Sequence, residues 1–328
     1  MATKLFIEAI RDALAGEMAR DERVFVLGED VGVRGGVFRV TQGLYEVFGE
    51  SRVLDTPLSE SAIVGVAIGA SAAGLRPVAE IQFADFILPA MNQIISEAAK
   101  MRYRSNNDWH CPMVIRAPFG GGVHGGLYHS QSMEALFTHI PGLKVLVPAT
   151  PYDAKGLLIS AIRDDDPVLF FEHKRLYRSV RAEVPDELFT VPIGQARVAR
   201  DGEDVTVITY GLTLQWVLEA ADRLAEEDGI ETHVLDLRTL RPLDEGAILN
   251  AARRTGKVLI VHEDNKVCGI GAEVSALISE RVLFDLDAPI ERLAGPEVPA
   301  MSFASTLEQA YMLSVDRIAA AIGRLARF

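Results

Sequence analysis

The sequence contains few cysteines, few aromatic residues and no long apolar run. Its two cysteines, Cys111 and Cys268, stand far apart and form no metal-binding or redox motif. A reducing, cytoplasmic setting is therefore expected. No stretch reaches the roughly 18 apolar residues that a membrane helix needs. The first twenty residues show a mixed-charge amphipathic pattern and lack the apolar core of a signal peptide.

Basic residues are also in deficit. The chain has 46 Asp and Glu against 33 Lys and Arg, which gives a formal net charge of -13. Because no basic block offsets this acidity, a nucleic-acid or anionic-membrane partner is disfavoured. The 328 residues, 49% of them apolar, are enough for two domains with ordinary cores.

Apolar strand patterns alternate with helical patterns in both halves of the chain, which predicts an α/β protein with two mostly parallel sheets flanked by helices. Strands are expected at 24–27, 78–83, 113–117, 144–147, 168–171, 205–209, 232–235 and 258–261. Helices are expected at 4–20, 61–73, 87–103, 151–162, 214–227, 245–253 and 272–283. A basic, then proline-marked stretch separates the halves. The predicted domains are 1–180 and 205–328, joined by a linker at 181–204.

The most informative stretch runs from Leu54 to Phe86. Glu60 precedes an uncharged run, 61–75, in which glycine and alanine recur, so this helix is expected to be buried against another backbone. The helix dipole favours the carboxylate of Glu60, whereas loss of water favours the acid, so the two effects shift its pKa in opposite directions. An inert helix-start carboxylate is the alternative. The following strand carries Gln82 and an aromatic ring to the same end of the sheet, and Phe86 follows.

A glycine-rich loop, PFGGGVHGGLYHSQS at 118–132, follows another strand. Gly120, Gly122 and Gly125 match a dinucleotide-binding pattern in form. No helix opens on these glycines, and no acidic residue lies about twenty residues further on to bind a ribose. The segment is better interpreted as a mobile loop at the mouth of a site, with His124 and His129 as candidate site residues.

These segments resemble a known family. DTPLSESAIVG followed by GLRPVAEIQFADF, together with YHSQS, closely resembles the beta subunit of the thiamine-diphosphate-dependent 2-oxo acid dehydrogenases. The resemblance runs nearly end to end. It implies a pyrimidine-binding domain followed by a transketolase C-terminal-like domain, with thiamine diphosphate as cofactor.

The resemblance also implies site residues. Glu60 would protonate N1′ of the cofactor's aminopyrimidine, which then acts as the base that removes the thiazolium C2 proton. His129 would protonate a sulfur of the lipoyl group that receives the acyl fragment. The remaining pocket residues by this resemblance are Glu29, Leu58, Gln82 and Phe86.

The family's cations and partners follow in the same way. The Gly-Asp-Gly motif that binds Mg²⁺ is absent, since Arg200-Asp201-Gly202 lacks the first glycine and the downstream Asn. An alpha subunit is therefore expected to hold Mg²⁺ and the diphosphate, in an α2β2 heterotetramer. Relatives bind a structural potassium ion where this chain has Ala161, Asp164 and Asp166. Glu297 and Phe328 fall where relatives meet the lipoyl acyltransferase core.

The substrate is expected to be a branched 2-oxo acid. FFEHKRLYRSV, YHSQSMEALF and LAGPEVPAMSF resemble the bacterial branched-chain enzyme, 3-methyl-2-oxobutanoate dehydrogenase, more than the pyruvate enzyme. A pyruvate dehydrogenase beta subunit is the alternative. Two other classes compete: a dinucleotide-dependent oxidoreductase, which rests on the glycine pattern alone, and a non-catalytic assembly subunit, which requires an inert Glu60.

Overall fold

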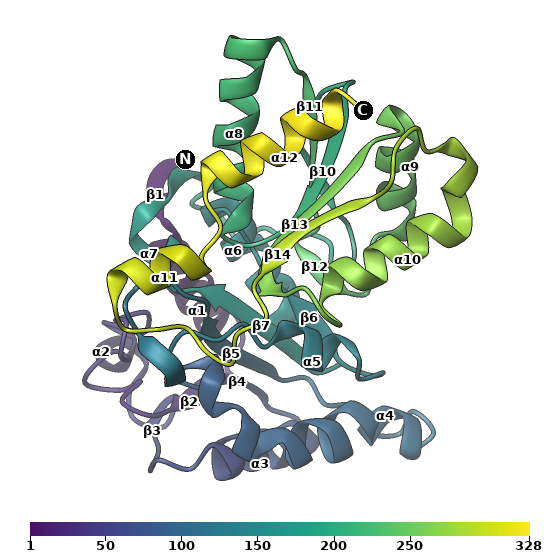
Figure 1. Cartoon of the computed structure of the whole chain (residues 1–328). Helices are drawn as coiled ribbons and strands as arrows, with labels where there is room; N and C mark the ends of the chain where they lie inside the picture. The colour runs from purple at the N-terminus through teal and green to yellow at the C-terminus, as the bar shows by residue number, and fades with distance from the viewer. The chain divides into compact units, whose positions relative to one another are not determined.

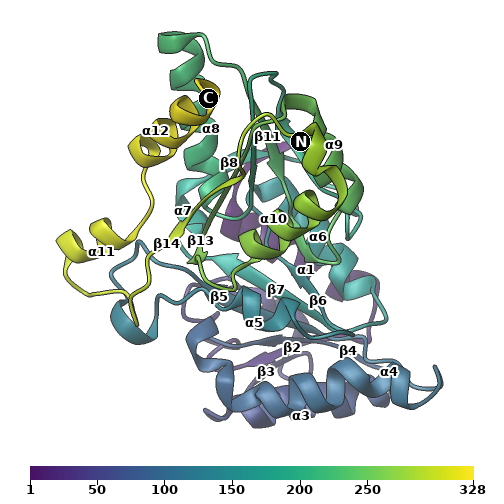
Figure 2. The ribbon, with the colours of Figure 1, turned by 45° about the vertical axis from the view of Figure 1, so that its right-hand side comes forward.

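Strands and helices alternate along the whole chain in the computed structural model, which describes residues 1–328 (Figures 1 and 2). They group into two units. The first unit comprises residues 1–119 and 136–193, and the second comprises residues 120–135 and 194–328. The glycine-rich loop is thus grouped with the second unit, although it lies within the first half of the sequence.

The first unit is built on six parallel strands. Their order is β6 (Lys144–Leu146), β7 (Val168–His173), β5 (Val114–Phe119), β4 (Arg76–Glu80), β2 (Val24–Gly28) and β3 (Val53–Asp55). Because helices cover such a sheet on both faces, its strands are almost continuously apolar. Helix α1 (Phe6–Arg20) packs on α6 (Pro151–Arg163), and α3 (Glu60–Ala72) packs on β4.

The second unit has its own sheet, in the order β14 (Glu291–Gly295), β13 (Val258–Asn265), β10 (Val205–Thr209), β11 (Thr232–Asp236) and β9 (Arg197–Arg200). Only the edge strand β9 is antiparallel to its neighbour. The predicted α/β fold with mostly parallel sheets is confirmed. Its helices are α8 (Thr213–Asp228), α9 (Glu245–Thr255), α10 (Ile270–Val282) and α12 (Val315–Ala326).

Local sequence signals explain several element boundaries. Thr150 caps α6 by accepting the Asp153 backbone N–H at 3.1 Å, and Pro151 occupies the first turn, where no N–H is needed. Asp244 caps α9 by accepting the Ala247 N–H at 3.0 Å. The stretch predicted as a linker carries two strands, since β8 (Arg181–Val184) pairs with β1 (Ala2–Leu5) and β9 joins the second sheet.

Shorter elements complete the chain. They are α2 (Leu44–Phe48), α5 (Glu134–Thr138), α7 (Leu176–Ser179), β12 (Thr239–Arg241), α11 (Ser305–Tyr311), η5 (Gly126–Tyr128) and η6 (Leu283–Asp285). No helix combines the length and the apolar character that crossing a membrane would require. Both cysteines are free, Cys111 buried and Cys268 exposed.

The helix expected at 87–103 is not a single regular helix. It is a series of short turns: η1 (Ala84–Phe86), η2 (Leu88–Ala90), the π segment η3 (Gln93–Glu97), η4 (Ala98–Lys100) and α4 (Met101–Arg104). Pro89 lies near the start of the series and has no backbone N–H to donate, which disfavours a regular helix there.

Helix α3 is also less buried than expected. Ile63, Val64 and Ala67 are buried, but Val66 is 55% exposed. A Cβ built on Gly65 or Gly69 would meet no atom within 4 Å. One face of the helix therefore packs on its own unit, while the opposite face is uncharged, made of small residues and open.

Candidate active site

Two acidic side chains follow neighbouring strands of the first unit: Glu29 comes directly after β2, and Glu60 opens α3, the helix after β3. The carboxyl ends of parallel strands are where open α/β sheets bind ligands. Glu29 directly follows β2, and its side chain is nearly buried. Burial raises the pKa of Glu29, and the negative charges of Glu60 and Asp30 raise it further. Among the predicted site residues, Glu60 is thus the one whose charge acts on the pKa of Glu29.

The loop after β2 is fixed by hydrogen bonds. The Gly36 N–H donates to the Asp30 carbonyl oxygen at 2.7 Å, and the Thr41 hydroxyl donates to the Val31 carbonyl oxygen at 2.7 Å. Gly32 donates its N–H to the Asp55 carboxylate at 2.6 Å, and a Cβ on Gly32 would lie 2.6 Å from that same carboxylate. A side chain at position 32 would thus displace the Asp55 carboxylate from this hydrogen bond, which holds the loop that begins at Glu29 against the end of β3.

Glu60 is the first residue of α3, and its side chain is half-buried. The Ser59 side chain does not cap the helix. Leu58, just before it, is 79% exposed. Gln82 and Phe86 follow β4 and are both half-buried. These four predicted pocket residues thus belong to the same unit as Glu29 and present partly open surfaces.

Aromatic rings support this edge of the sheet. The ring of Phe86 lies 5.6 Å from that of Phe83, which lies 5.4 Å from Phe38, and Phe38 lies 5.3 Å from Tyr177. The Lys174 ammonium lies 5.8 Å from the Phe83 ring centroid. Contacts of this kind fix ring orientation beyond simple burial. They link Phe86 to the interior of the unit.

A buried ionic cluster lies at the inner end of these rings. Arg116 on β5 is fully buried and donates from Nη1 to Glu80 at 2.5 Å, from Nε to Glu172 at 2.6 Å, and from Nη2 to Glu172 at 2.7 Å. The Tyr177 hydroxyl donates to Glu172 at 2.6 Å. Burial raises the pKa of Glu80 and of Tyr177. It would lower the pKa of Arg116, but the two carboxylates raise that pKa by more.

The apolar patterns of these strands did not reveal the cluster, although the sequence carries a signal for it. Three adjacent apolar strands each carry a charged residue: Glu80 ends β4, Arg116 lies within β5, and Glu172 lies near the end of β7. Glu80 and Arg116 are direct partners in the pairing of β4 with β5. Charges placed this way in strands buried on both faces can only be accommodated as mutual partners.

The glycine-rich loop is anchored in the second unit. The Gly121 N–H donates to Glu263 at 2.7 Å, and the N–H groups of Gly122 and His124 donate to Glu308 at 3.0 Å. The His124 ring nitrogen Nδ1 lies 2.6 Å from the same carboxylate. His124, whose role the sequence left open, therefore fixes the loop. His129 lies beyond this anchor in the same loop and is half-buried.

An acidic cluster lies behind the loop. Glu134 is fully buried and accepts the Tyr210 hydroxyl at 3.0 Å. Burial, followed by the charge of Asp264, raises the pKa of Glu134 well above its usual range. Burial likewise raises the pKa of Asp264 to about 6. Beside them, burial lowers the pKa of His262 to about 4.

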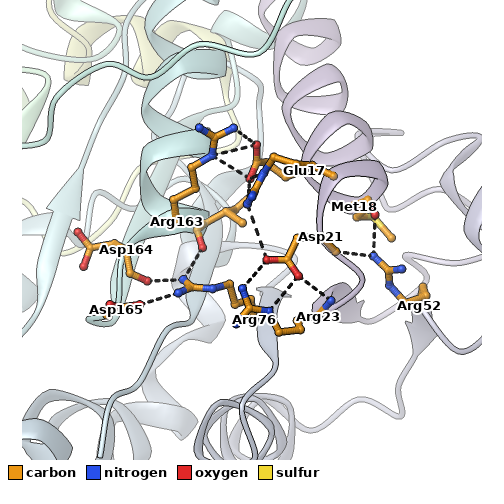
Figure 3. Close-up of polar contacts among 11 residues, drawn as sticks. Glu17, Met18, Asp21, Arg23, Arg52, Arg76, Arg163, Asp164 and Asp165 are labelled. Carbon is orange, nitrogen blue, oxygen red and sulfur yellow. Dashed lines mark hydrogen bonds and ion pairs between the residues drawn. The ribbon is translucent and has the colours of Figure 1, made fainter.

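The predicted potassium site belongs to the first unit. The carboxylates of Asp164 and Asp166 already face the Lys144 ammonium. Figure 3 shows Arg76 against the same turn, where it donates to the Asp164 carbonyl oxygen. The Ala161 carbonyl oxygen accepts the Asp164 N–H at 3.3 Å. These residues do not fit a bound metal ion as they stand. Glu297 and Phe328, predicted for partner binding, are both exposed in the second unit.

Comparison with known proteins agrees with this architecture. Residues 3–180 match the transketolase pyrimidine-binding domain, and residues 194–318 match the transketolase C-terminal domain. A solved structure described as a split-gene transketolase, inactive beta4 tetramer, superposes with a TM-score of 0.79 at 26% identity over 98% of both chains. The chain is therefore a transketolase-like protein with both domains.

Two relatives narrow the family. The 2-oxoisovalerate dehydrogenase subunit beta of Bacillus subtilis is 63% identical over 328 residues, which is 100% of both chains. The pyruvate dehydrogenase E1 component subunit beta of the same organism is 52% identical over 90% of this chain and 91% of the relative. The chain belongs to the family of 2-oxo acid dehydrogenase beta subunits, as the sequence resemblance predicted.

Proposed function

We propose that this chain is the beta subunit of a branched-chain 2-oxo acid dehydrogenase that decarboxylates 2-oxo acids with thiamine diphosphate. The carrying observation is the 63% identity to 2-oxoisovalerate dehydrogenase subunit beta over the full length of both chains. The pyruvate dehydrogenase subunit is only 52% identical. This difference in identity favours a branched substrate such as 3-methyl-2-oxobutanoate.

The residues at the edge of the first sheet suit the aminopyrimidine half of the cofactor. Bound thiamine diphosphate supplies the electron sink for decarboxylation. Phe86, held by its contact with Phe83, offers a ring for stacking, and Leu58 and Gln82 offer partly exposed contacts. Glu60 is the first residue of α3, and we assign to its carboxyl group the hydrogen bond to N1′ of the aminopyrimidine ring.

A partner must complete the site. Asp201, in the only approximation to the diphosphate motif, lies 3.5 Å from His233 and 3.6 Å from Arg254 within its own unit. We therefore assign Mg²⁺ and the diphosphate to an alpha subunit in an α2β2 heterotetramer. The open, uncharged face of α3 supports such a contact. A similar chain that is described as an inactive beta4 tetramer supports the need for a second type of subunit.

The second unit would serve acyl transfer. We assign to His129 the proton that a lipoyl sulfur takes up, because histidine is the side chain best able to donate one near neutral pH. The anchoring of Gly121, Gly122 and His124 holds the first part of the loop in place. Exposed Glu297 and Phe328 remain candidates for contact with the lipoyl acyltransferase core.

The test is reconstitution with the alpha subunit of a branched-chain enzyme. We expect carbon dioxide release from 3-methyl-2-oxobutanoate to exceed that from pyruvate, and the chain alone to be inactive. Turnover without a partner would contradict the proposal, and a preference for pyruvate would favour the pyruvate dehydrogenase alternative.

Glu60→Gln distinguishes a catalytic from an assembly role. General acid–base groups contribute about a hundred- to ten-thousand-fold in rate. In the reconstituted enzyme, we expect hydrogen–deuterium exchange at thiamine C2 to slow within that range, with assembly unchanged. Unchanged exchange would return Glu60 to an inert helix-start carboxylate and favour a non-catalytic subunit.

A further inference from the structure

The turn between α6 and β7 carries three consecutive aspartates, and each is matched by a cation of the chain. The Lys144 Nζ lies 2.7 and 2.6 Å from the two carboxylate oxygens of Asp164 and 3.4 Å from Asp166. Arg102 Nε lies 2.5 Å from Asp166, and Arg76 Nη2 lies 2.5 Å from Asp165. Three carboxylates therefore face three permanent positive charges.

The backbone oxygens of the turn are occupied as well. Arg76 Nη1 donates to the carbonyl oxygens of Ile162 at 3.0 Å and Asp164 at 2.8 Å, as Figure 3 shows for the guanidinium lying against this turn. The Asp166 N–H donates to the Asp164 carboxylate at 2.9 Å. A metal ion bound by oxygen would need several of these lone pairs at once.

The sheet register fixes the ammonium at this place. Lys144 opens β6 and pairs with Val168, two residues after Asp166, and its N–H donates to the Pro167 carbonyl oxygen at 3.1 Å. Its side chain is 26% exposed and that of Asp164 is 18% exposed. The ammonium is thus built into the fold beside the turn and is shielded from most of the solvent.

We propose that the Lys144 ammonium acts as an internal substitute for a monovalent cation at this turn. An ammonium carries the charge of a potassium ion, is similar in size, and donates up to three hydrogen bonds to oxygen. It therefore neutralises Asp164 and Asp166 and holds the turn in shape without a bound metal. The subunit needs no potassium for its stability.

Two variants of Lys144 test this in the complex with the alpha subunit. Lys144→Ala removes the side chain and leaves room for an ion, whereas Lys144→Met removes the charge but keeps the stem. The thermal unfolding midpoint is measured in potassium chloride and in choline chloride at one ionic strength. Lys4→Met is the matched control, because Lys4 is also ion-paired with two aspartates, Asp12 and Asp186, and is 18% exposed.

In choline chloride, both Lys144 variants are expected to unfold about 3–6 °C below the wild type, the shift that one or two lost interactions produce in a domain of this size. Potassium is expected to restore part of that loss in Lys144→Ala only. For the wild type, the unfolding midpoint in potassium chloride is expected to equal that in choline chloride. The same equality is expected for Lys4→Met.

A wild-type midpoint that potassium raises above the choline value would overturn the proposal. So would Lys144 variants with an unchanged midpoint, or a loss in Lys144→Ala that potassium does not reduce. If neither variant assembles with the alpha subunit, the wild-type midpoints in the two salts still test whether potassium stabilises the protein. Because the readout is unfolding and not decarboxylation, its result is independent of the proposed activity.

Discussion

Arg116 shows how one residue organises the interior of the first unit. A guanidinium without solvent is tolerated there only because Glu80 and Glu172 accept its N–H groups at 2.5 to 2.7 Å. The Tyr177 hydroxyl bonded to Glu172 connects this cluster to the aromatic rings that reach Phe86. The cluster therefore couples the packing of three strands to the edge where the cofactor is proposed to bind.

Arg116→Met is expected to lower the free energy of unfolding by about 3–5 kcal/mol, because two buried carboxylates lose their partner. The measurement is unfolding in urea. The matched comparison is the triple variant Arg116→Met, Glu80→Gln, Glu172→Gln, in which no buried charge is stranded. It is expected to be more stable than the single variant, and equal losses in both would show that packing, not charge, sets the effect.

Substitution of His129 is expected to affect decarboxylation of the 2-oxo acid and acylation of the lipoyl domain to different extents. His129→Ala should retain much of the decarboxylation measured with an artificial electron acceptor, because the cofactor supplies the electron sink. It should lose acylation of the lipoyl domain, which needs an additional proton. Cofactor binding is checked by titration in the same preparation.

His124→Ala is the control from the same loop. It removes the contact of the His124 ring to Glu308 but keeps the histidine proposed as proton donor, so acylation of the lipoyl domain is expected to fall less than in His129→Ala. If His129→Ala also reduced both assays equally, His129 would serve decarboxylation or cofactor binding instead. No loss in either assay would make it a bystander.

At the scale of elements, the acidic cluster joins the loop from Gly120 to Ala135 to β13. The stability of this contact is therefore expected to depend on pH. Asp264 has a pKa of about 6 against an ordinary value of 3.8, so the folded state binds its proton more tightly than the unfolded state does. Its contribution to stability is therefore complete below about pH 4 and is lost as the pH rises towards 6. His262 acts in the opposite direction, because its pKa is lowered to about 4 from 6.5.

The variant Asp264→Asn isolates the contribution of the Asp264 carboxyl group to the pH dependence of stability. As the pH falls from 6 to 4, wild type is expected to gain stability relative to Asp264→Asn, by at most about 1.4 kcal/mol per pH unit. Urea unfolding at each pH measures the difference. The other titratable or charged groups around the site are present in both proteins, so their contributions cancel in the difference. They are Glu134, Glu263, Tyr210, Tyr311 and His262. A difference independent of pH would contradict the assignment.

Most elements of the fold could be predicted from the sequence because each rests on a local signal. The strand β10 (Val205–Thr209) lies where its apolar run predicted it, and α6 begins at Pro151 as expected. The segment from 87 to 103 could not be predicted in detail, since Pro89 and the π turn at Gln93–Glu97 interrupt an otherwise helical pattern.

The site could be predicted only in part. Glu29, Glu60, Gln82 and Phe86 are close in sequence to a strand end, so motif and topology together indicate them. The Arg116 cluster and the Lys144 contact join residues from separate strands and turns. Their pairing depends on sheet register, which a single sequence does not reveal.

At the scale of the whole molecule, the open face of α3 is the feature that a free chain does not explain. From Ser61 to Ala72 the helix has no charged residue, and Gly65 and Gly69 have no neighbour within 4 Å of an added Cβ. Small residues allow two backbones to approach closely, and the absence of charge removes any penalty for losing water. This face is therefore suited to contact with another subunit.

Gly69→Arg tests that contact. In the free chain, the added side chain meets open space, and arginine favours a helix by up to about 1 kcal/mol over glycine. The free energy of unfolding of the free chain should therefore be unchanged or slightly raised. In the assembly, a guanidinium would be forced into a close, uncharged contact and would have to lose its water without a partner. Co-purification with the alpha subunit and the mass of the complex by light scattering are both expected to be reduced. Gly246→Arg in α9 is the matched control, because the only atom within 4 Å of its added Cβ is Asp244 Oδ1 at 3.7 Å. If Gly69→Arg assembled as well as Gly246→Arg, the face of α3 would not be buried in the complex, and the exposed glycines would need a different explanation.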